Sequence, residues 1–80
     1  MKKIPYINSE KTGHHIDELM LRKGLSVRDL QMQFGFTTPQ AIYKWLHGTS
    51  LPSIDNLVIL SVILGVSMDD IIVLDAHPTK

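Results

Sequence analysis

Residues 26–48 read SVRDLQMQFGFTTPQAIYKWLHG, in which two short helical patterns flank a glycine. Ser26 with Asp29 three residues later forms a capping-box pattern, because a hydroxyl and a carboxylate can each accept a hydrogen bond from a free backbone N–H. Gly35 ends the first pattern, since glycine adopts the positive φ angle that closes a helix without steric cost. The spacing therefore predicts a helix that begins at Ser26, stops at Gly35 and is followed by a tight turn.

A second short helix is expected after the turn. Thr38 is a suitable N-cap, and Pro39 fits the first helical position, where its missing N–H is no loss. Ile42 and Trp45 stand at helical spacing, so we expect both in the core, and Trp45 there rather than stacked on a base. Gly48 ends this helix. Two helices locked at a fixed angle by buried apolar residues form the unit that places the second helix in the major groove of DNA.

The rest of the chain predicts three more helices and no strand, because apolar residues do not alternate with period two over any long stretch. Serines begin two of these helices and glycines end two of them. Pro5 disfavours helix at the residue before it, so the N-terminus is expected to be extended. The predicted parts are an arm at 1–9, an all-α domain at 10–75 with further helices near 10–23, 53–65 and 67–74, and a flexible tail at 76–80.

Composition suits one small folded domain of 80 residues, 44% of them apolar. The chain has no cysteine for disulfides or thiolate metal sites and no apolar run long enough to span a bilayer, so we expect a cytoplasmic protein. A formal net charge of zero disfavours nucleic-acid binding. However, residues 1–48 hold seven Lys and Arg against four acids, whereas residues 49–80 hold one Lys against four. This uneven distribution favours one face turned toward an anion.

A longer pattern of apolar residues, glycines and serines runs through most of the chain. Its members are Ile16, Leu19, Gly24, Leu25, Ser26, Leu30, Gly35, Ile42, Gly48, Pro52, Leu57, Leu60, Leu64, Val66, Ser67, Ile71 and Ile72. In this order and spacing the pattern resembles the phage-repressor and Cro-like family of helix-turn-helix regulators, also called the XRE (xenobiotic-response-element) family. The resemblance implies a five-helix, lambda-repressor-like domain, usually dimeric, that binds double-stranded DNA as a bacterial transcriptional regulator, here expected to be a repressor.

The resemblance also implies which residues contact DNA. Gln40 and Lys44, one turn apart on the helix at 38–47, match positions that read base edges, and the amide of glutamine can bind adenine through two hydrogen bonds. Free N–H groups at a helix start suit a phosphate, so backbone contacts are expected there. The remaining expected contacts, with phosphates, sugars or a thymine methyl, are Ser26, Val27, Arg28, Thr38, Tyr43 and His47.

Three departures from the family pattern bear on this expectation. The spacing from Gly35 to Ile42 is one residue longer than usual, and Pro39 stands where a polar base reader is common. The loop after Gly48 lacks the cations that relatives often carry, so we expect modest DNA affinity with a shallow salt dependence. The competing interpretation is a protein-interaction module, or an antitoxin-type accessory subunit, that kept the fold with weak DNA affinity.

The predicted fourth helix is apolar almost all round, which indicates burial on both faces. Its core face is expected to hold Ile54, Leu57, Val58, Leu60 and Leu64. One candidate cover for the opposite face is the arm, through Ile4, Tyr6 and Ile7. The other, which we favour, is a two-fold homodimer interface formed by Ile59, Val62, Ile63, Ile72 and Val73.

No catalytic, cofactor or metal site is expected. His14 and His15 are adjacent and point about 100° apart on a helix, so they cannot readily share one ion. Asp69 and Asp70 fit the charge preference of a helix start better than a catalytic pair. The sequence has no nucleophile-base arrangement and no glycine-rich phosphate loop, so neither an enzyme activity nor a small-molecule substrate is expected.

Overall fold

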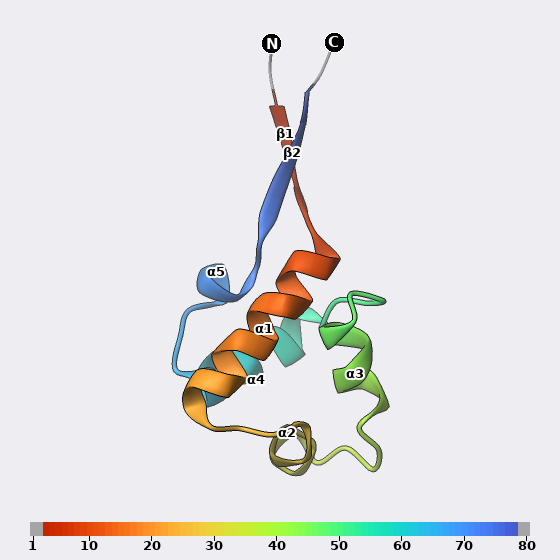
Figure 1. The fold of residues 1–80 in the computed structure, drawn as a ribbon, viewed down its shortest axis with the longest axis vertical. Helices are drawn as coiled ribbons and strands as arrows, with labels where there is room; N and C mark the ends of the chain where they lie inside the picture. The colour runs from red at the N-terminus through yellow and green to blue at the C-terminus, as the bar shows by residue number, and fades with distance from the viewer. Residues whose placement is uncertain (1–2, 79–80) are drawn as a thin grey trace.

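A computed structural model describes residues 3–78 as five helices and a two-stranded antiparallel sheet (Figure 1). In chain order the elements are β1 (Lys3–Ile7), α1 (Ser9–Lys23), α2 (Val27–Phe34), α3 (Gln40–Leu46), α4 (Ile54–Leu64), α5 (Met68–Ile71) and β2 (Leu74–Pro78). The predicted five-helix architecture is confirmed, with a small sheet added to it. Within residues 3–78, none of the helices has the length and apolar character needed to cross a membrane.

Capping residues begin and end the central helices largely as the sequence predicted. Ser26 begins α2 with a complete capping box, and Gly35 closes it at φ 72°. One boundary differs, because α3 starts at Gln40, with Pro39 in the N-cap position and no side-chain cap. The prediction that Thr38 caps this helix is therefore wrong. At ψ 6°, Pro39 joins the helix only through its carbonyl oxygen, which accepts the first helical hydrogen bond.

One apolar core joins the helices. It consists of Ile16, Leu19, Met20, Leu30, Ile42, Trp45, Leu57, Leu60, Leu64 and Ile71. The prediction that Ile42 and Trp45 are buried is confirmed, at 0% and 4% exposure. Ile54 and Val58 are 77% and 44% exposed, so their predicted place in the core is wrong. Helix α4 packs against α1 and α5 through a single stripe of leucines, and these two residues lie outside it.

The chain after α5 forms a strand instead of a longer helix and a flexible tail. Helix α5 ends at Ile71, because Ile72 takes the extended angles φ −78° and ψ 130°. Strand β2 then pairs antiparallel with β1, with Ile7 opposite Leu74. The predicted helix up to residue 74 is wrong, and β2 includes residues 76–78 of the segment that was predicted to be a tail. The prediction of an extended N-terminal arm is confirmed for residues 3–7.

Side chains at the start of α1 hold the base of the two-stranded ribbon formed by β1 and β2. The Asn8 N–H donates to the Val73 carbonyl at 2.9 Å, and Thr12 Oγ1 accepts from the Val73 N–H at 3.0 Å. Asp75 accepts from Asn8 Nδ2 at 2.7 Å and pairs with Lys11 Nζ at 3.1 Å. The ribbon is thereby fixed to α1 and projects away from the helices (Figure 1). The ribbon therefore does not cover the exposed side of α4, contrary to one interpretation of the sequence.

Candidate nucleic-acid interface

Helix α3 presents its polar side chains on one exposed face. Gln40, Tyr43, Lys44 and the following His47 are all exposed, and their spacing places them opposite the buried side of the helix. The rings of Tyr43 and His47 lie one turn apart, with 6.1 Å between their centroids. The structure thus brings together four of the residues predicted to contact DNA.

The predicted contact residue Thr38 lies exposed in the turn that precedes α3. It lines a shallow hollow on one flank of the helix together with Gln40 and Lys44. Ser50 also lines this hollow, because its N–H donates to the Lys44 carbonyl at 3.3 Å and folds the loop back onto the helix end. Sequence reasoning missed Ser50, although its place in the loop that follows α3 was a possible signal.

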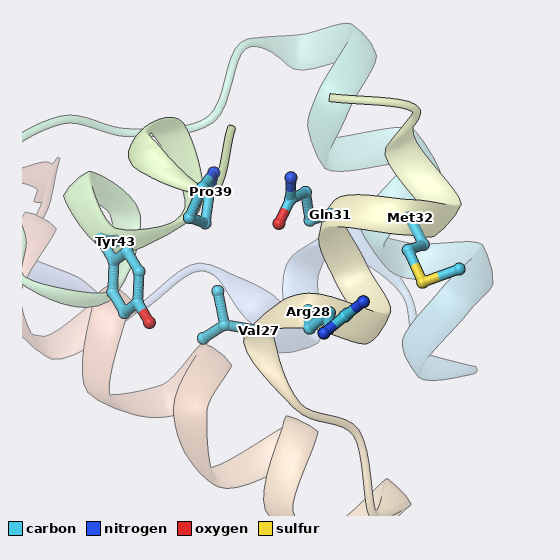
Figure 2. Close-up of a pocket in the computed structure, with 6 residues that line it drawn as sticks. All are labelled: Val27, Arg28, Gln31, Met32, Pro39 and Tyr43. Carbon is cyan, nitrogen blue, oxygen red and sulfur yellow. The ribbon is translucent and has the colours of Figure 1, made fainter. Parts of the chain in front are cut away.

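A second hollow separates α2 from α3 (Figure 2). From the α3 side, Pro39 and Tyr43 face Val27 and Gln31 of α2 across it, as Figure 2 shows. The complete lining is Val27, Arg28, Gln31, Met32, Pro39 and Tyr43. The hollow therefore joins the predicted contacts on α2 with those on α3 into one continuous surface. Met32, which is 71% exposed at its edge, had not been predicted as part of this surface.

The start of α2 is occupied by its own capping box. The Ser26 N–H donates to Asp29 Oδ2 at 2.8 Å, and Ser26 Oγ accepts from the Asp29 N–H at 3.1 Å. Hydrogen bonding by the backbone and then by the side chain of Ser26 lowers the pKa of the exposed Asp29 carboxyl. Because the Ser26 N–H is engaged, the N–H groups of Val27 and Arg28, which lack an intrahelical acceptor, are the ones left for an anion.

Aromatic packing and one amide fix the angle between α2 and α3. The ring of Phe36, in the turn, stacks on the ring of Phe34 with 4.9 Å between the ring centroids. It also makes an edge contact with Trp45, with 6.1 Å between the centroids. Phe34 also contacts Trp45, at 5.4 Å. Gln31 Nε2 donates to the Phe36 carbonyl at 3.3 Å, and the Phe36 N–H donates to the Gln31 carbonyl at 3.1 Å. The turn is thus held from both sides, although it was predicted only from its glycine.

Charge on these two helices is more positive than on the rest of the described chain. Helices α2 and α3 contain the cations Arg28 and Lys44 and a single acid, Asp29, which the capping box engages. The acids of residues 49–78 lie in α4, α5 and β2 instead. A rigid, polar and mildly cationic helix face with free N–H groups beside it can bind a phosphate backbone and reach the base edges of a groove.

Comparison with known proteins agrees with this geometry. The crystal structure of the DNA-binding domain of BldD superposes with a TM-score of 0.69 at 15% sequence identity, over 82% of this chain and 94% of that domain. This likeness shows the fold. No curated protein sequence matches the chain. A family model described as helix-turn-helix matches residues 16–71, well over half of the sequence. The chain therefore belongs to the helix-turn-helix family, of the XRE type.

Proposed function

We propose that this protein is a sequence-specific double-stranded DNA-binding protein that regulates transcription as a repressor in the cytoplasm. The observation that carries the proposal is the exposed polar face of α3, held at a fixed angle by the packed turn. A groove-reading helix needs rigidity, because base contacts discriminate only when the side chains arrive in register. The likeness to BldD, whose DNA-binding domain has this fold, supports the proposal.

The exposed residues divide into base readers and backbone contacts. Gln40 and Lys44 stand on the outer face of α3, and we assign base-edge contacts to them. We assign contacts with one sugar-phosphate backbone to the N–H groups of Val27 and Arg28 and to the guanidinium of Arg28. The remaining backbone contacts are the Ser26 hydroxyl, Thr38, Tyr43 and His47.

Two copies of the chain are proposed to bind one two-fold symmetric site. Half-sites of such regulators are spaced by a helical turn of DNA, so a dimer contact sets the operator spacing. Of the interface predicted on α4 and α5, Ile59 and Val62 are 41% and 76% exposed. Ile63 and Ile72 pack against the chain's own core, and Val73 is half-buried. The exposed apolar face on α4 and α5 is therefore smaller than the predicted interface. A contact between copies through another part of the chain is compatible with this.

A fluorescence anisotropy titration against a random-sequence duplex at two salt concentrations tests DNA binding. We expect salt-sensitive binding that Lys44→Ala weakens several-fold, because a phosphate or base contact is lost. Lys23→Ala is the matched control, because this substitution removes the same charge at a different place. Lys23 is the last residue of α1 and lies beside Gly65. Equal losses for both variants indicate non-specific attraction to net charge. Absence of binding at low salt, even at tens of micromolar protein, favours the protein-interaction module.

Base reading by Gln40 needs a second measurement. After selection of a preferred operator from a random pool, Gln40→Ala should lower the preference for the operator over random DNA by about 1–3 kcal/mol. Its affinity for random DNA should stay unchanged, since no phosphate contact is removed. A uniform loss on both duplexes assigns Gln40 to the backbone instead.

A further inference from the structure

The hollow between α2 and α3 adjoins both kinds of contact assigned to DNA (Figure 2). On one side lies the start of α2, where the N–H groups of Val27 and Arg28 are left for a phosphate. On the other side Pro39 and Tyr43 bound the hollow from the flank of α3. Its volume of about 420 Å³ is far above the roughly 30 Å³ share of one water, so the edge of a base fits in it. A base pair next to the contacted phosphate is therefore the part of DNA best placed to fill this space.

One polar atom of this hollow can only accept a hydrogen bond. Gln31 Nε2 donates to the Phe36 carbonyl at 3.3 Å, and this bond fixes the orientation of the amide, because only the nitrogen can donate to a carbonyl oxygen. The amide oxygen Oε1 points into the hollow and the nitrogen points away from it, as Figure 2 shows. Within residues 3–78 no donor forms a hydrogen bond with this oxygen. Gln31 therefore presents a free acceptor, and no donor, to a group that enters the hollow.

The other side chains around the hollow do not select one base by hydrogen bonding. The Arg28 guanidinium only donates, and it lies beside the N–H groups assigned to phosphate. The Tyr43 hydroxyl can both donate and accept, so it suits every base edge equally. Val27 and Pro39 supply apolar surface. The hollow thus combines one selective acceptor with an apolar wall.

We propose that the Gln31 oxygen accepts a hydrogen bond from the N6 amine of an adenine, so that the hollow reads one A·T base pair beside those read by α3. In the major groove only adenine N6 and cytosine N4 are donors, whereas guanine and thymine present acceptors. The apolar wall decides between the two donors, because only the A·T pair also carries a methyl group, on thymine. This inference rests on the proposed DNA binding. It adds a base reader on α2, whose contacts assigned above are all with the backbone.

Replacement of each adenine of a selected operator, one at a time, by nebularine tests this hydrogen bond, because nebularine is a purine nucleoside without the N6 amine. Affinity is measured by fluorescence anisotropy for the unmodified protein and its variants. We expect one adenine per half-site whose replacement lowers the affinity of the unmodified protein about three- to tenfold. Gln31→Ala should abolish this difference between adenine and nebularine. Gln40→Ala is the matched control, since it removes an amide from α3 and should leave the difference at that adenine unchanged.

Gln31→Ala also removes the bond to the Phe36 carbonyl, so a second variant separates base reading from support of the turn. Gln31→Glu keeps an acceptor but cannot donate to Phe36. Its charge should lower the affinity for every duplex, yet the ratio of affinities for adenine and nebularine should remain. Loss of this ratio in both variants assigns the effect to the turn and overturns the proposal.

Uracil in place of the thymine paired with that adenine tests the apolar wall. Loss of the methyl group should lower affinity about threefold, and Val27→Ala should reduce this difference. A ratio of affinities for adenine and nebularine that Gln31→Ala leaves unchanged at every position overturns reading by Gln31. A preference for cytosine that depends on Gln31, or no effect of uracil, overturns the choice of an A·T pair. Each of these outcomes requires DNA binding, so absence of binding to any duplex is a separate result that overturns the proposed function together with this inference.

Discussion

Gly13 of α1 meets Trp45 of α3 backbone to backbone. A Cβ atom on Gly13 would overlap the Trp45 carbonyl oxygen and stand 2.7 Å from the Leu46 carbonyl oxygen. A glycine inside a helix normally costs about 1 kcal/mol relative to alanine. Here it permits α1 to cross the end of α3 at close range, and this crossing positions the helix that carries the candidate base readers.

We therefore expect Gly13→Ala to destabilise the protein, although alanine favours helix. The close contact with two carbonyl groups forces the helices apart, which should lower the free energy of unfolding by about 1–3 kcal/mol. Urea denaturation followed by circular dichroism measures the change. His14→Ala, an exposed change on the same helix turn, is the control and should stay within about 0.5 kcal/mol. A more stable Gly13 variant would show that α1 and α3 separate without cost.

The Thr12 hydroxyl is the buried link between α1 and the ribbon. Its residue is 1% exposed, and Oγ1 accepts from the Val73 N–H. Thr12→Val keeps the shape but leaves that N–H unpaired, so unfolding free energy should fall by about 1–3 kcal/mol. Thr12→Ser retains the oxygen and should lose less, and hydrogen exchange should show the Val73 amide protected only in the serine variant. Equal losses for both variants would assign the effect to packing alone.

The sequence predicted best what neighbouring residues determine. Ser26 and Gly35 act through their own backbone, so the ends of α2 followed from spacing alone. The buried side of α4 could not be predicted in this way. Apolar residues lie almost all round that helix, so periodicity cannot select one face. Strand β2 was missed because its five residues include proline and its partner strand lies some seventy positions away in the chain. Its stability depends on the tertiary contacts of Val73 and Asp75 with α1.

The same distinction applies to the candidate interface. The polar face of α3 could be predicted, since the positions of Ile42 and Trp45 set which side is buried. The role of Phe36 could not, because a turn residue gives no periodic signal and its ring packs on two different helices. The engagement of the Ser26 N–H by Asp29 was implied by the capping-box pattern itself. This hydrogen bond removes the Ser26 N–H from phosphate binding. That result follows only when the capping box and the phosphate contact are considered at the same helix start.

The Asp29 carboxylate should make stability depend on pH in the acid range. Hydrogen bonding to Ser26 lowers its pKa in the folded protein below the ordinary value of 3.8. The stabilisation is therefore present above that value and is lost as the pH falls through the lower folded pKa. Asp29→Asn should have a lower Tm than the unmodified protein at pH 6, with the difference shrinking toward pH 2. A difference that stays constant over this range would contradict a role for the carboxylate charge.

The contact of Phe36 with Phe34 and Trp45 should link stability to DNA binding. Phe36→Ala removes two ring contacts from the half-buried turn, so we expect a loss of about 2 kcal/mol in unfolding free energy. Because the same rings hold α3 against α2, the variant should also bind a selected operator more weakly under conditions where it remains folded. Met32→Ala is the control for stability, since Met32 is 71% exposed on the adjacent surface. Unchanged operator affinity in a destabilised Phe36 variant would indicate that Gln31 and the backbone alone maintain the angle of α3.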